Sequence, residues 1–484
     1  MQSSYGQIGR IPASGLLAWA MAAMLIVGCG ATGPKNQPAG ELLPPADPPP
    51  AIDTDLAGLS GGHADPSSDP GDPTATGDPG ETPSRIRVRT FDDLMKLKPE
   101  WIDPALGNLL MAYEAGYATR EDVIEARAGI KRLVDAARQL VNLRDYHLLP
   151  PQERRRRDRA NAVKIVETIV SMGFGFDKED PDGHRPENLF LHHVLKRRRG
   201  YCVSLSLLTL SVAYYLNVPM HGVRAPGHLF VRFGSYSDVE NDQRNFEMTD
   251  NGSERDNRHY MQRYSIHPQA IVNNAFLTNL DGRCVFSDVT SNLGSLCMLK
   301  DDVPKAIEWY RRAVALDPAN PQAQYNLGTA LARHNDPGGA IAAYREAIRL
   351  NPGDYFSLCA RGQLYFENGD PTVGFEDVAA AISLRPRDPH GLVLRGVLYA
   401  KSDKPEQAEK DFRQALQNAP DDVAANRNLA LLFARQNRAD EARAQITRFL
   451  ELAPADPDAA RLKAYLDHIN SGDGGGNTPP PGSR

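Results

Sequence analysis

The sequence predicts an α+β domain followed by an all-α array of stacked helices. Between residues 85 and 285, helical segments precede short runs of strand-forming residues bounded by Gly and Pro, which is the order of an α+β domain. Between residues 286 and 470, prolines and small residues recur every 34 positions, which indicates repeated helix pairs. The chain is therefore expected to hold two kinds of folded region.

The composition of the 484-residue chain is that of an ordinary globular protein, with 41% hydrophobic and 24% charged residues. The 55 Lys and Arg nearly balance the 61 Asp and Glu, which argues against a dedicated nucleic-acid binder. Basic runs at Arg154–Arg157 and Lys196–Arg199 are interpreted as solvated helix faces. Five cysteines are too few for a disulfide scaffold, so the domains must rest on apolar cores.

Residues 1–29 are predicted to be a lipoprotein signal peptide. The apolar stretch from Leu16 to Val27 is too short to span a bilayer, which needs roughly 20 residues. Its end, Ile26-Val27-Gly28-Cys29, resembles a bacterial lipobox, which implies that Cys29 is acylated and holds the protein at a membrane of the cell envelope. Gly30, in place of aspartate, points to the outer membrane. The alternative is an unprocessed apolar N-terminus.

Two segments are expected to be disordered. Residues 30–84 are rich in Pro, Gly and Asp and hold few large apolar residues, so they are interpreted as a tether between the anchor and the folded part. Residues 471–484 are interpreted as a disordered tail.

The domain at residues 85–285 is expected to begin with packing helices. Thr119, followed by Glu121 and Asp122, predicts one helix start, and Pro150-Pro151 predicts another. The run from Val203 to Leu216 is apolar almost all round, which predicts a buried helix with Cys202 in its first turn. There the helix dipole and free N–H groups favour the thiolate. The alternative is that Cys202 is a small hydrophobic residue at the end of a core helix.

Three strands are expected after that helix: Met220 to Ala225, His228 to Phe233, and Asn245 to Met248. His228 begins the second strand and Asp250 follows the third, so an antiparallel pair would bring a base and a carboxylate to one sheet edge. With Cys202 against that edge, the three would form a nucleophile, a base and an orienting group. Asp256 is a weaker substitute for Asp250. No metal or cofactor site is expected, because His192 and His193 are poor co-ligands and the acidic loop at residues 177–183 lacks calcium-loop spacing.

The motifs Gly200-Tyr201-Cys202-Val203-Ser204-Leu205-Ser206, Pro226-Gly227-His228 and Thr249-Asp250 resemble those of bacterial transglutaminase-like domains. The resemblance covers roughly residues 92–281 and implies a papain-like Cys-His-Asp site at Cys202, His228 and Asp250. It implies acyl transfer from an amide, with water as acceptor in a protease or amidase and an amine as acceptor in a crosslinking enzyme. A non-catalytic scaffold that retains this fold is the alternative.

The repeat region resembles tetratricopeptide repeats. Prolines stand 34 residues apart at Pro318, Pro352, Pro386, Pro420 and Pro454, and a small residue keeps the same step from Gly294 to Ala430. Five repeats and a capping helix from Ala459 to Ile469 are expected, with a concave groove that binds a protein or peptide. Cys284 and Cys297 are considered for a disulfide, with burial of Cys297 as the alternative, and Cys359 is assigned to the core.

Overall fold

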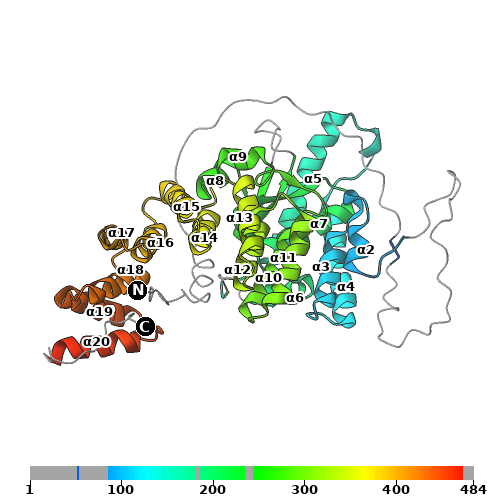
Figure 1. The fold of residues 1–484 in the computed structure, drawn as a ribbon. Helices are drawn as coiled ribbons and strands as arrows, with labels where there is room; N and C mark the ends of the chain where they lie inside the picture. Colours follow the sequence, from blue (N-terminus) through cyan, green and yellow to red (C-terminus); the bar gives the residue numbers. More distant parts are fainter. Residues whose placement is uncertain (1–51, 54–85, 145, 181–184, 235–243, 472–484) are drawn as a thin grey trace, which may run out of the picture. The chain divides into compact units, whose positions relative to one another are not determined.

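A computed structural model describes residues 52–53, 86–144, 146–180, 185–234 and 244–471 (Figure 1). They form two compact units, one that ends at Asn326 and one that begins at Leu327. Across these described residues, no helix combines the length and the apolar character that crossing a bilayer would require. Residues 1–51, which include Cys29, residues 54–85 and the tail from residue 472 lie outside the described residues. Of the predicted tether, Ile52 and Asp53 are described, and they form a short strand that pairs with Ile86 and Arg87.

The first unit is a mixed α/β domain. Its α-helices are α2 (Phe91–Met95), α3 (Pro104–Glu114), α4 (Arg120–Leu140), α5 (Pro151–Ser171), α6 (Leu191–Arg197), α7 (Cys202–Leu216), α8 (Asn257–Arg263), α9 (Pro268–Val272), α10 (Val285–Leu299) and α11 (Val303–Leu316). Its strands are β1 (Ile52–Asp53), β2 (Ile86–Arg87), β3 (Gly175–Phe176), β4 (Arg199–Gly200), β5 (Met220–Ala225), β6 (His228–Phe233), β7 (Arg244–Glu247), β8 (Ser253–Arg255) and β9 (Asn279–Leu280).

The main sheet is antiparallel, in the order β8-β7-β6-β5-β9. The hairpin of β5 and β6 pairs Ala225 with His228 across the Pro226-Gly227 turn, and the left-handed backbone of Gly227 (φ 65°) closes that turn. Strands β1 and β2 form one short parallel pair, and β3 and β4 form another. The three strands expected after the cysteine helix are therefore present.

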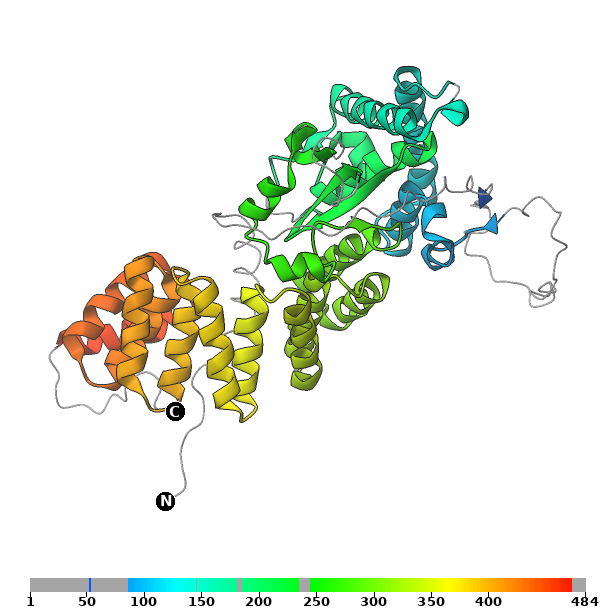
Figure 2. The same ribbon diagram turned by 90° about the horizontal axis from the view of Figure 1, so that it is seen from above.

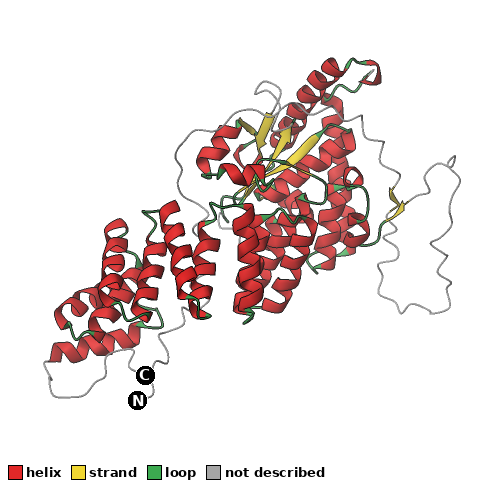
Figure 3. Cartoon of the chain, turned by 45° about the horizontal axis from the view of Figure 1, so that its top comes forward, coloured by secondary structure: helices red, strands yellow, loops and turns green. Residues whose placement is uncertain are grey.

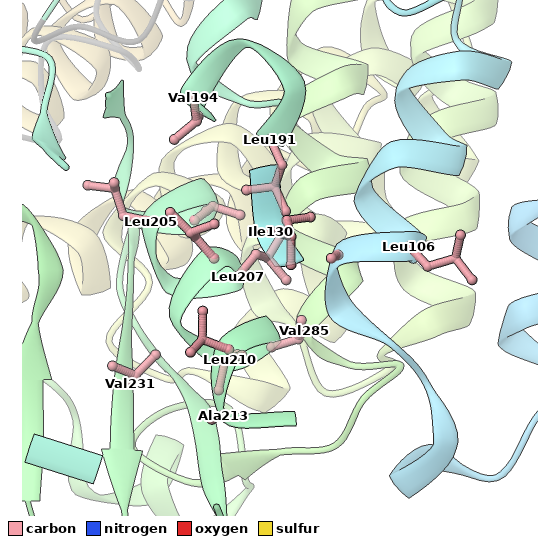
Figure 4. Close-up of a cluster of buried hydrophobic side chains, with 14 of the residues drawn as sticks. Leu106, Ile130, Leu191, Val194, Leu205, Leu207, Leu210, Ala213, Val231 and Val285 are labelled. Carbon is pink, nitrogen blue, oxygen red and sulfur yellow. The ribbon is translucent and has the colours of Figure 1, made fainter. Parts of the chain in front are cut away.

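Helix α7 is the centre of the core, as its nearly all-apolar sequence predicts. Its side chains from Leu205 to Ala213 meet residues of α3, α4 and α6 on one side and Val231 of β6 on another (Figure 4). The neighbouring helix α4 begins where the sequence predicts, because Thr119 and Asp122 form a reciprocal capping box. Helix α5 begins at Pro151, also as expected.

The helix pair α10–α11 is packed into the first unit. Phe286 is fully buried and lies so close to Gly107 that a Cβ there would come within 2.3 Å of its ring. Arg224 of β5 is also buried and bonds Asp288 of α10 (Nη2–Oδ2 2.9 Å) and Asp317 after α11 (Nη1–Oδ2 2.6 Å). This helix pair, the first of the expected repeats, therefore shares a core with the α/β domain.

The second unit is a stack of antiparallel helix pairs, shown in yellow to red in Figure 2, and its helices are red in Figure 3. From α12, which runs across the boundary of the two units, the helices are α12 (Pro321–Arg333), α13 (Pro337–Leu350), α14 (Tyr355–Glu367), α15 (Pro371–Leu384), α16 (Pro389–Lys401), α17 (Pro405–Asn418), α18 (Val423–Arg435), α19 (Ala439–Leu452) and α20 (Ala459–Ser471). A Cβ on Gly396 would lie 2.5 Å from the Phe412 ring, so the repeated glycine and aromatic residue interlock as the period predicts.

The pairing of Cys284 with Cys297 is excluded by the helix that separates them. Cys284 caps α10 and Cys297 lies in its last turns, thirteen residues further on, and both thiols are free. At about 1.5 Å of rise per residue they are roughly 20 Å apart, beyond the reach of a disulfide. Cys359 is buried in α14, as expected.

Candidate active site

Cys202 is the first residue of α7 and is only partly buried. Its position follows from the sequence, because Tyr201 is extended and the apolar helix begins immediately after it. The first N–H groups of a helix have no partner within it and carry its positive dipole end, so they favour a negative charge at this position. The residue before Tyr201, Gly200, is an extended residue of β4; a Cβ there would lie 2.6 Å from the Ser204 hydroxyl.

A buried polar network holds the start of α7. The hydroxyl of Ser204 accepts a bond from the Tyr201 N–H (3.0 Å) and donates to the Asn188 carbonyl (2.6 Å). The Asn188 side chain donates to Asp177 (2.8 Å), which also accepts from Arg197 (2.8 Å). Although burial opposes its ionisation, these bonds lower the pKa of Asp177. Asp177, the first residue of the acidic loop, thus supports the start of the cysteine helix.

The exposed basic run beside this network also has a local role. Helix α6 ends at Arg197, and Arg198 takes the left-handed conformation (φ 56°). The guanidinium of Arg198 donates to the Met172 carbonyl (2.9 Å), and that of Arg199 donates to the Gly173 carbonyl (2.9 Å). These hydrogen bonds link the residues just before Cys202 to the segment that follows α5.

His228 begins β6 and lies between two partners. Its Nε2 is 2.6 Å from Oε2 of Glu247, and the Cys202 thiol lies near its ring. Burial would lower the pKa of His228, but the bonds to Cys202 and Glu247 outweigh it and raise the pKa well above the usual value. The imidazolium is therefore the favoured form at neutral pH.

Glu247, the last residue of β7, is itself held from two sides. Its Oε1 accepts bonds from the Thr249 hydroxyl (2.5 Å) and the Thr249 N–H (3.2 Å). Burial would raise the pKa of Glu247, but the bonds with His228 and Thr249 lower it. The carboxylate is thus charged and fixed in direction, and it orients His228.

Asp250 does not hold the position that the sequence suggested. The carboxylate of Asp250 accepts bonds from Ser253 (2.7 Å) and Arg255 (2.6 Å), and more than half of this side chain is exposed. The chain leaves β7 after Glu247 and enters the 3-10 helix η6 (Met248–Asp250), which carries Asp250 past the histidine. Asp256 caps α8 through the N–H of His259 (2.7 Å).

Strand register explains why Glu247 reaches His228. The pairs Val231–Phe246 and Arg232–Asn245 place residue 247 opposite residue 230, on the sheet face that His228 shares. The signal in the sequence was the carboxylate of Glu247 between two apolar residues of a predicted strand, Phe246 and Met248. A charged residue in a buried strand position normally has a partner.

Aromatic rings cover the imidazole. Tyr264 is stacked beside His228 with ring centroids 5.8 Å apart, and the buried ring of Tyr260 lies 3.9 Å from that of Phe230. This arrangement limits the access of water to the His228–Glu247 pair and strengthens their attraction.

The other candidate groups lie apart from this site. His192 is buried with Nε2 3.1 Å from the Tyr117 carbonyl, and its ring lies 4.0 Å from that of His193. Burial lowers the pKa of His192 to about 4. Over the part of the chain that the structure describes, no group of three or more His, Cys, Asp or Glu residues is arranged to hold a metal ion.

Comparison with known proteins identifies two kinds of region in the chain. The family profile of the transglutaminase-like superfamily matches residues 124–287, and tetratricopeptide-repeat profiles match residues 294–335, 321–354 and 393–458. A UPF0162 protein of Xylella fastidiosa is 31% identical over 70 residues, which are 14% of this chain and 25% of that protein. F-box only protein 21 of Mus musculus is 44% identical over 52 residues, which are 11% of this chain and 8% of that protein.

Two solved structures are among those similar to part of this chain. A thermophilic TPR protein of Thermus thermophilus is 22% identical, with a TM-score of 0.34, and the match covers 37% of this chain and 98% of that one. The pilF protein of Pseudomonas aeruginosa is 18% identical, with a TM-score of 0.35, over 40% of this chain and 92% of that one. The family profiles show that the chain contains a transglutaminase-like core domain followed by tetratricopeptide repeats.

Proposed function

We propose that this protein catalyses thiol-dependent acyl transfer from an amide, with Cys202 as nucleophile, His228 as acid and base, and Glu247 as the orienting group. The observation that carries the proposal is the placement of His228, which lies beside the Cys202 thiol with its Nε2 2.6 Å from Oε2 of Glu247. A buried carboxylate that fixes an imidazolium beside a helix N-terminal cysteine favours the thiolate, which is the reactive form.

In this reaction the Cys202 sulfur attacks the carbonyl carbon of the amide. The His228 imidazolium gives its proton to the departing nitrogen, so that ammonia or an amine leaves and a thioester replaces the amide bond. Water or a primary amine then attacks the thioester, its proton passes to His228, and the thiolate is regenerated. We infer that the N–H groups at the start of α7 stabilise the oxyanion of both steps.

The repeats suggest a protein as the substrate or partner. Tetratricopeptide stacks offer extended surfaces that bind proteins or peptides. We infer that they bring a protein chain to the thiol, and that the amide is a side-chain carboxamide or a peptide bond. We also propose the cell envelope, at the outer membrane, as the site of action, with Cys29 as the lipid anchor; Cys29→Ala would then release the protein from membranes.

The reactivity of Cys202 tests the catalytic proposal in the chain carrying Cys29→Ser. Burial raises the pKa values of Cys284, Cys297 and Cys359, so these thiols serve as internal controls. At about pH 6.5, iodoacetamide should label Cys202 first, and His228→Ala should abolish that preference. Labelling of Cys202 at the rate of Cys297, with or without His228, would favour the non-catalytic scaffold.

Acyl-enzyme capture tests the reaction itself. We expect a glutamine-containing peptide to add its acyl mass to Cys202, and hydroxylamine to remove that mass. Cys202→Ser is the matched control, since it should fold but form no thioester. If no acylated species formed with either peptide carboxamides or peptide bonds, the acyl-transfer proposal would fail even with a reactive thiol.

A further inference from the structure

The turn that joins α4 to α5 exposes leucines among arginines. Leu140 at the end of α4 is 53% exposed, and Leu148 before α5 is 71% exposed. The sequence from residue 138 to residue 160 contains seven arginines and three carboxylates, a net charge of +4 in a chain whose net charge is −6. We call Leu140, Arg144, Leu148 and Arg154–Arg157 the α5 tip. Figure 1 shows it in cyan at the outer end of α5, away from the main sheet.

The α5 tip is held in shape by its own contacts. The Tyr146 hydroxyl donates to Asp158 (2.5 Å), and the Arg154 guanidinium lies over the Tyr146 ring and donates to the Leu149 carbonyl (3.1 Å). The Arg157 guanidinium donates to the Arg144 carbonyl. The carbonyl acceptors are uncharged, while Asp158 interacts electrostatically with Arg154 and Arg157, so the sequence around the tip keeps a net positive charge of +4 after its carboxylates are counted.

We propose that the α5 tip binds an anionic lipid surface. Its positive charges would face the lipid phosphates, while Leu140 and Leu148 enter the headgroup region between them. A projecting turn with isolated leucines fits a flat, deformable bilayer. A protein interface of stable size would instead be expected to present a broader packed area with aromatic anchors. This contact does not depend on the acyl-transfer site.

With the α5 tip on the lipid surface, the protein would have a second membrane contact in addition to the proposed lipid anchor at Cys29. A single membrane-binding signal is often reversible, and a basic patch adds to an acyl anchor. A domain held at two points would also keep a fixed face toward the bilayer. The lipid-free chain should therefore retain a weaker, salt-sensitive affinity for acidic vesicles.

Vesicle co-sedimentation of the full chain carrying Cys29→Ser tests this inference. We expect binding to phosphatidylcholine vesicles that contain about 30% phosphatidylglycerol, no binding to pure phosphatidylcholine, and loss of binding in high salt. Each of Arg144→Gln and Arg156→Gln should weaken binding about fivefold. Leu148→Ser should weaken it about tenfold.

Matched controls separate the tip from general charge and apolar effects. Arg311→Gln and Arg345→Gln each remove one exposed positive charge, as each tip arginine variant does, and Val272→Ser removes an apolar side chain that is 72% exposed. These controls should bind like the parent chain. Equal binding by the tip variants, equal binding to neutral vesicles, or retention of an acidic protein or an oligonucleotide without vesicle binding would each overturn the proposal.

Discussion

Replacement of Glu247 by Gln removes the charge that faces His228 while keeping the size of the side chain. The two side chains are only 12% and 11% exposed, so their interaction is weakly screened. Unit charges about 4 Å apart attract by about 4 kcal/mol at an effective dielectric constant of about 20. Glutamine retains part of the hydrogen bond, and each 1.4 kcal/mol is a factor of ten. We therefore expect Cys202 alkylation at neutral pH to slow by about 10²- to 10³-fold.

The assay is the second-order rate constant for iodoacetamide at Cys202, measured across pH for parent, Glu247→Gln and Glu247→Asp chains. The aspartate keeps the charge on a shorter arm and should recover part of the rate. Asp250→Asn is the matched control, because its carboxylate bonds Arg255 and Ser253. A parental rate in Glu247→Gln combined with a large loss in Asp250→Asn would refute the assignment of Glu247 and restore Asp250 as the orienting group.

Three further outcomes follow from the same contacts. Thr249→Val removes a hydroxyl that bonds Glu247 at 2.5 Å; we expect Cys202 alkylation to slow about tenfold, with a shifted pH profile, as the loss of about one hydrogen bond to a charged group implies. Because folding raises the pKa of His228, this residue stabilises the fold fully below pH 6.5, and the stabilisation is lost as pH rises through the raised pKa. Because folding lowers the pKa of Glu247, this residue stabilises the fold above pH 4.5, and the stabilisation is lost as pH falls through the lowered pKa. Urea denaturation of parent and Glu247→Gln chains should therefore differ most between about pH 4.5 and 6.5, and a constant difference across pH would contradict the charged pair. Arg224→Met leaves two carboxylates of the first helix pair without their buried partner, so we expect about 3–5 kcal/mol of destabilisation in urea; a change below 1 kcal/mol would show that the cluster relaxes into solvent.

The local sequence determines many of the helices and the repeats of this protein, because the sequence patterns that predict them are short-range. Helix α4 begins at its capping box, the apolar run makes α7 a buried helix, and the 34-residue period sets the repeats. Each signal depends on neighbours within a few turns of helix, or on a step that repeats along the chain. Cys202 and His228 belong to this class, since one begins a helix and the other begins a strand.

The carboxylate partner and the packing of the first repeat were decided only by tertiary structure. The short turn η6 carries Asp250 past the histidine, whereas strand register places Glu247 on its face. Register depends on pairing between strands that are separated in the chain. The local sequence pattern therefore does not distinguish Glu247 from Asp250, three residues further on, as the partner of His228. In the same way, the 34-residue period identifies α10 and α11 as a repeat, but their burial against the α/β domain arises from long-range contacts of Phe286 and Arg224.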